Sequence, residues 1–166
     1  PYGFVDEPIA ADLKIPTGFA IAPDGRIFIR QKAGQVRVVD NGELQEGYFI
    51  DLSGEVNTTA DRGLMGVAVH PDFPNTPYVY LSYVYDPPEA KTHNAAGARV
   101  SRLLRVSADP NNLNVALPGS GVVLLGTNST FANIGNPDVG DQKPFTCFDS
   151  GGGYVRDCLP LEGTSH

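Results

Sequence analysis

The chain has 166 residues, of which 41% are hydrophobic and 19% are charged, and its formal net charge is -7. Such an acidic balance argues against a nucleic-acid binder, because reading a phosphate backbone requires a basic face. The sequence also contains 19 glycines and 14 prolines, which predicts many turns and few long helices. No apolar run approaches the length that crosses a membrane as a helix. These properties favour one turn-rich β domain, or a part of one.

Four short strands are predicted between residues 18 and 51. The dipeptides Asp24-Gly25 and Asn41-Gly42 separate alternating apolar runs, and both supply the positive φ angles that two-residue hairpin turns require. Gly34 divides the second run from the third, and Tyr48-Phe49-Ile50 forms the fourth. This segment is therefore expected to form an antiparallel four-stranded meander.

A second set of four strands is predicted between residues 64 and 125. Its members are Leu64 to Val69, Tyr78 to Val84, Arg99 to Val106, and Val122 to Leu125. Two four-stranded sheets in succession, with no helical periodicity between them, favour a β-propeller in which each sheet is one blade. A β-sandwich is the alternative, because it also strings short strands at turn-marked intervals.

Residues 126–166 hold few apolar runs and are expected to form one long loop. Cys147 and Cys158 bracket a glycine-rich segment that can fold back on itself, which favours a disulfide and an oxidising compartment. The stretch Asn133 to Asp141 offers the hard oxygen ligands that calcium prefers. It lacks the EF-hand spacing, so a solvated loop is the simpler interpretation of that stretch.

The densest motif runs from Asp61 to Phe73. Gly63 and Gly66 allow a close backbone approach at the start of a buried strand, as the innermost strand of a blade requires. The sequence His70-Pro71-Asp72-Phe73 then forms a turn, which gives His70 a structural role there.

Three further sets of residues have ordinary structural interpretations. The tripeptides Asn57-Thr58-Thr59 and Asn128-Ser129-Thr130 match the N-glycosylation pattern, which arises easily by chance. Arginines recur at every third position on one predicted strand, so they do not share a face and are expected to be solvated. We also expect His93 to be exposed and without function. The arginines are Arg99, Arg102 and Arg105.

An ordered set of these motifs closely resembles the soluble quinoprotein glucose/sorbosone dehydrogenase family. The set comprises Gly63 to Phe73, Tyr78 to Tyr83, Arg99 to Arg102, and the upstream hairpin Ala22 to Phe28. The resemblance implies a six-bladed β-propeller, of which this chain is the N-terminal portion. The all-β fold expected here is thus a partial propeller, with blades at about 18–51 and 64–125 and a long loop at 126–166.

The same resemblance implies binding of pyrroloquinoline quinone (PQQ) and calcium at the mouth of the central channel, and oxidation of sugars or related alcohols. Asp61 occupies the family's quinone-facing position, two residues before the first glycine of its Gly-Leu-Leu-Gly run, where Gln or Glu is more common. His166 is the implied catalytic base, because Thr164-Ser165-His166 resembles the start of the segment that carries it. The family's other cofactor ligands lie beyond that point. The chain alone is therefore not expected to be active without the remaining polypeptide.

The implied enzyme is secreted or periplasmic. A non-catalytic propeller used for adhesion or protein binding is the alternative, because a fold alone does not confer chemistry. A sugar-lactone hydrolase is a third class, but no cluster of carboxylates and Asn for its divalent metal is evident in the sequence.

Overall fold

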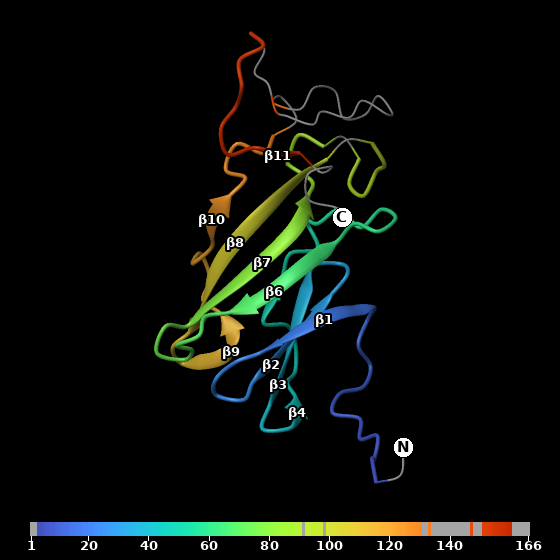
Figure 1. Ribbon diagram of the computed structural model, residues 1–166, viewed down its shortest axis with the longest axis vertical. Helices are drawn as coiled ribbons and strands as arrows, with labels where there is room; N and C mark the ends of the chain where they lie inside the picture. The colour runs from blue at the N-terminus through green and yellow to red at the C-terminus, as the bar shows by residue number, and fades with distance from the viewer. Residues whose placement is uncertain are drawn as a thin grey trace.

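The computed structural model describes residues 3–90, 92–97, 99–130, 133, 147 and 151–160. The elements within these residues are all β-strands, arranged in two antiparallel sheets (Figure 1). Over the same residues, no helix is long and apolar enough to cross a membrane. His166 lies outside the described residues, as does all of the calcium candidate 133–141 except Asn133.

The first sheet contains five strands in the order β1-β2-β3-β4, with β5 also paired to β3. Asn41 and Gly42 have φ angles of 53° and 80° at the β3–β4 turn, as the Asn-Gly dipeptide predicts. The predicted fourth strand corresponds to the short strand β5, and the sheet has one further short strand, β4, that was not predicted. These two strands pair with opposite ends of β3. The strands are β1 (Pro16–Ile21), β2 (Ile27–Gln31), β3 (Gln35–Asp40), β4 (Glu43–Leu44) and β5 (Ile50–Asp51).

The second sheet follows the order β10-β8-β7-β6, and all its pairings are antiparallel. Two additional strands pair with β8, namely β9 near its end and β11 near its start. Sequence analysis missed β9 because its asparagine-rich approach is typical of a turn. The strands are β6 (Leu64–Val69), β7 (Tyr78–Tyr85), β8 (Val100–Asp109), β9 (Asn112–Ala116), β10 (Val122–Leu125) and β11 (Leu159–Pro160).

One hydrophobic core joins the two sheets. The Phe28 ring is fully buried and meets the Phe49 and Phe73 rings edge to face, with centroids 5.1 Å and 5.7 Å apart. From the second sheet, Val79 and Leu81 of β7 enter the same cluster. Alternate residues of β7 are therefore buried against the first sheet, as a pleated strand requires.

The first strands of the two sheets, β1 and β6, lie against each other, and each is an edge strand of its sheet. Apolar side chains remain exposed on both outer flanks. On the first sheet Phe19 and Ile21 are 66% and 64% exposed, and on the second Val122 and Leu125 are 43% and 49% exposed. Two open apolar flanks are what a segment of a larger ring presents.

The arginines before and along β8 are not solvated, so that prediction is wrong. Arg99 is buried and its Nε lies 2.5 Å from Asp86 Oδ1. The Arg102 and Arg105 guanidinium groups lie over the rings of Tyr85 and Tyr78, at 3.5 Å and 4.3 Å from the ring centroids. Flat guanidinium groups pack on aromatic faces in this way, and the tyrosines of β7 provide those faces.

Two other predicted surface residues are held by contacts. His93 is half-exposed, but its Nδ1 lies 3.2 Å from Asp86 Oδ2 and its Nε2 lies 3.0 Å from the Ser53 carbonyl oxygen. His93 is thus exposed, as expected, although it is not free of contacts. Asn57 is fully buried, and its Nδ2 donates to Asp86 and to the Ala95 carbonyl. A glycan cannot occupy that nitrogen in the folded chain.

The predicted disulfide between Cys147 and Cys158 is present, and both cysteines are buried. Next to it, the Asp157 carboxylate accepts hydrogen bonds from the backbone amides of Gly126, at 2.6 Å, and Thr127, at 3.0 Å. The disulfide and this carboxylate together fasten residues 155–160 beside the end of β10.

Replacing Cys147 and Cys158 by serine should lower the free energy of unfolding by about 2.5 to 3 kcal/mol. The two cysteines are 11 residues apart, and without the crosslink the unfolded chain gains the conformational entropy of the opened loop. Chemical denaturation with and without reductant measures this loss. The serine variant should be insensitive to reductant, and an equal response in both proteins would contradict the assignment.

The backbone entering β6 approaches the first sheet closely. Gly63 has a φ of 142°, and a Cβ at this position would lie 2.6 Å from the Lys32 carbonyl oxygen. The same oxygen accepts a hydrogen bond from the Leu64 amide at 3.0 Å. Glycine is therefore required at the junction between the two sheets.

The substitution Gly63→Ala should lower the free energy of unfolding by about 1 to 3 kcal/mol, because it adds both backbone strain and a collision. Thermal unfolding measures the effect. Gly54→Ala is the matched control, since Gly54 has open space at its Cβ position and no positive φ. Equal melting temperatures for the two variants would contradict this account of the junction.

A buried phenol joins β7 to the connection between the sheets. The Tyr83 hydroxyl donates to Glu55 Oε1 at 2.7 Å, and the Tyr83 side chain is almost wholly buried. Burial, followed by the charge of Glu55, raises the pKa of Tyr83 far above its usual value. The folded protein therefore keeps this proton at a pH where the unfolded chain loses it.

Because the unfolded state binds fewer protons above about pH 10, Tyr83 makes folding less favourable as the pH rises through that range. Tyr83→Phe should flatten the fall in unfolding free energy between about pH 9.5 and 11, at a cost of about 1 kcal/mol near neutrality for the lost hydrogen bond. Denaturant unfolding at a series of pH values measures both effects. The exposed Tyr154 provides the control variant, Tyr154→Phe, which should leave the slope unchanged.

Candidate functional site

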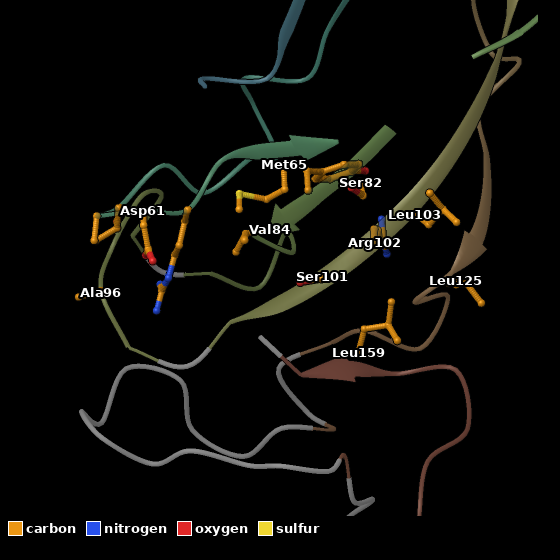
Figure 2. Close-up of a pocket in the computed structure, with 14 residues that line it drawn as sticks. Asp61, Met65, Ser82, Val84, Ala96, Ser101, Arg102, Leu103, Leu125 and Leu159 are labelled. Atoms are coloured by element: carbon orange, nitrogen blue, oxygen red, sulfur yellow. The ribbon is translucent and has the colours of Figure 1, made fainter. Parts of the chain in front are cut away.

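A cavity of about 460 Å³ opens beside the start of β6 (Figure 2). It lies at the end of the second sheet where β6 and β8 begin and β7 ends (Figure 1). Its walls come from segment 59–62, the loop before β8, strands β6 to β8, and the ends of β10 and β11. The lining residues include Asp61, Arg62, Met65, Val84, Arg102 and Leu125.

Asp61 is the acidic side chain of this cavity. It is exposed, and among the described residues nothing donates a hydrogen bond to its carboxylate. The preceding residue, Ala60, has a φ of 53°, and the Ala60 carbonyl accepts a hydrogen bond from Lys32 Nζ at 2.5 Å. Asp61 therefore lies on a bent segment whose backbone is held by the Lys32 side chain, while its own carboxylate remains available to a ligand.

Arg62 places a cation beside Asp61. Its Nη2 donates to the Gly97 carbonyl at 2.6 Å, whereas its Nη1 is buried without a hydrogen-bond partner in the described part of the chain. Burial lowers the pKa of Arg62, and the nearby positive charge of Arg99 lowers it further. Because Arg62 lines the cavity, its positive charge favours an anionic group there.

The remaining walls are largely apolar. Met65, Val84 and Leu125 contribute from three strands (Figure 2). Mostly apolar walls with a few polar groups are typical of sites that bind small molecules. No group of three or more His, Cys, Asp or Glu side chains that could hold a metal ion occurs over the described ranges.

The structure separates the candidate residues named from the sequence. Asp61 lines the cavity, whereas His166 lies outside the described residues. His70 follows the opposite end of β6, where its Nδ1 accepts a hydrogen bond from the Asp72 amide at 3.1 Å, which confirms its role in a turn. Sequence reasoning missed Arg62 and Arg102, although Arg62 directly follows the residue it selected.

Comparisons with known proteins agree with this arrangement. The glucose/sorbosone dehydrogenase family model matches residues 13–117. Quinoprotein glucose dehydrogenase B of Acinetobacter calcoaceticus is 31% identical over 87 residues, which cover 49% of this chain and 18% of that protein. An uncharacterized protein of Synechocystis is 28% identical over 98 residues, which cover 55% of this chain and 24% of that protein. The chain thus spans about a quarter or less of the curated relatives it matches.

Solved structures share the fold. A proposed oxidoreductase (glucose dehydrogenase) from Thermus thermophilus matches with a TM-score of 0.54 and 24% identity, covering 70% of this chain and 31% of that one. The PQQ-bound aldose sugar dehydrogenase from Streptomyces coelicolor matches with a TM-score of 0.50 and 20% identity, covering 69% and 31%. These neighbours are β-propellers, so the predicted partial propeller is confirmed and the sandwich alternative is not supported.

The family match covers well over half of the chain, and it includes the entry to β6 and the strands β6 to β8 of the cavity wall. The chain therefore belongs to the glucose/sorbosone dehydrogenase family.

Proposed function

We propose that this chain is the N-terminal part of a PQQ-dependent dehydrogenase that oxidises sugars or related alcohols. The observation that carries the proposal is the cavity at the start of β6, where Asp61 and the unpaired Nη1 of Arg62 adjoin apolar walls. The family match supports the same chemistry. The remaining polypeptide would complete the ring by covering the two apolar flanks at β1 and β10.

The donor set of the cavity is suited to PQQ, a planar quinone that carries carboxylates. The Arg62 guanidinium would pair with a carboxylate, Asp61 would lie at the polar edge of the site, and Met65 and Leu125 would contact the apolar ring. When bound, PQQ would accept the hydride that leaves the sugar carbon. Calcium has no described ligand cluster, so its ligands in the proposed enzyme would come from elsewhere.

Oxidation of a hydroxyl-bearing carbon releases both a hydride and the hydroxyl proton. A histidine is suited to take that proton, because its pKa ordinarily lies near neutrality. We assign this role to His166 on the family resemblance. Its removal should therefore affect turnover much more than cofactor binding.

The proposed location is outside the cytoplasm, secreted or periplasmic. The buried Cys147–Cys158 disulfide supports it, because such bonds persist in oxidising compartments and are rare in the cytosol.

The test uses the complete protein that the proposal requires, loaded with PQQ. His166→Gln should retain PQQ binding and lose turnover by about a hundredfold or more, which is the usual weight of general-base catalysis. Absorbance titration with PQQ measures binding, and sugar-dependent dye reduction measures turnover. The control is His70→Gln, which alters a turn histidine at the far end of β6 and should leave turnover nearly unchanged.

Two results would contradict the proposal in different ways. Unchanged turnover in the His166→Gln protein, with PQQ bound, would place the base elsewhere. Failure of the unmutated complete protein to bind PQQ would favour a non-catalytic propeller used for adhesion or protein binding.

A further inference from the structure

A buried carboxylate accepts contacts from three parts of the chain near the cavity. The Asp86 side chain, just after β7, is 1% exposed. Its oxygens accept hydrogen bonds from Arg99 Nε at 2.5 Å, from Asn57 Nδ2 at 3.1 Å and from the Asn94 amide at 2.7 Å. His93 Nδ1 lies 3.2 Å from the same carboxylate. Asp86 is therefore the centre of a polar network.

This network fastens two segments to each other, 57–62 and 92–97. Asn94 Oδ1 accepts a hydrogen bond from the Thr58 amide at 2.7 Å, and the Asn94 carbonyl accepts one from Thr59 Oγ1 at 2.5 Å. On the other side, Arg62 Nη2 donates to the Gly97 carbonyl at 2.6 Å. Asp61 lies between these attachments, so the backbone is held on both sides of it.

The network cannot be relaxed without cost. Arg99 and Asp86 are both buried, and removing one charge would deprive the other of this ion pair. Because the Asp61 carboxylate receives no hydrogen bond among the described residues, it is the backbone that keeps this side chain beside the cavity. That backbone is fixed by the contacts that Asp86 organises.

We propose that Asp86 is a positioning residue of this site. It orders the 92–97 loop and, through Asn94 and Asn57, the backbone that presents Asp61 to the ligand. Asp86 does not itself touch the ligand. The inference rests on the proposed function, in which Asp61 contacts the quinone or the sugar.

Two variants of the complete protein test the inference, one with a severe substitution and one with a milder substitution. Asp86→Asn removes the central charge, and it also leaves Arg99 buried without its counter-charge. Asn94→Gly is milder: it removes the acceptor for the Thr58 amide, keeps the Asn94 amide that donates to Asp86, and suits the φ of 60° at this position. Asn41→Gly is the matched control, because Asn41 has a φ of 53° in an exposed turn remote from the cavity.

The first readout is a double-mutant cycle with Asp61→Asn, followed through kcat/KM for sugar oxidation. Asn94→Gly should lower kcat/KM about tenfold in the unmutated background and by less than about twofold in the Asp61→Asn background, because residues that act through one another are not additive. Asp86→Asn should show the same non-additivity. Equal losses in both backgrounds, or no loss in either, would overturn the inference.

The second readout does not depend on activity. Hydrogen exchange across residues 57–62 should be about tenfold faster in Asn94→Gly than in the unmutated protein or in Asn41→Gly, because a fastened segment has been released. Unchanged exchange would overturn the inference even in an active enzyme. Faster exchange in a protein that neither binds PQQ nor oxidises sugars would refute the proposed function and leave the fastening role of Asp86 standing.

Discussion

The pairing of Asp86 with Arg99 is the constraint on which the candidate site depends. Both side chains are buried, at 1% and 0% exposed, and buried charges persist only when they are paired and hydrogen bonded. Asn57, His93 and Asn94 complete the shell of donors around the carboxylate. These donors come from segments beside the cavity. Because the buried Asp86–Arg99 pair requires hydrogen-bond partners, it holds those segments together at that end of the sheets.

Local signals in the sequence accounted for most of the strands. The hairpin that turns on Asn41-Gly42 is readable because both residues adopt the positive φ that this dipeptide favours. At Asp24-Gly25 only Gly25 has a positive φ. Long-range pairing is not local. Nothing around Arg99 indicates that Asp86 will meet it, and nothing around Arg102 names the Tyr85 ring that it covers. The arginines were therefore interpreted as surface charge, and the second sheet was outlined without the interactions that cross it.

Less of the candidate site than of the fold could be predicted from the sequence. Asp61 was found through family resemblance, because its spacing from Gly63 matches a motif, and no physical property of the chain selected it. Arg62 adjoins it, yet its guanidinium is held by a long-range contact with the 92–97 loop, in which Gly97 accepts a hydrogen bond from Nη2. The conformation of the 92–97 loop could not be predicted from its own residues, because the contacts that order it are made to the Asp86 carboxylate.

The buried amide of Asn57 bears on how the protein can be produced. Asn57-Thr58-Thr59 has the form of an acceptor for N-linked glycans, and a secretory host can attach a glycan before the chain has folded. In the finished fold that nitrogen is enclosed and donates to Asp86 and the Ala95 carbonyl. A sugar added early would keep those partners apart, so the glycosylation machinery of an expression host would compete directly with assembly of the cavity. A bacterial host without that machinery avoids the competition.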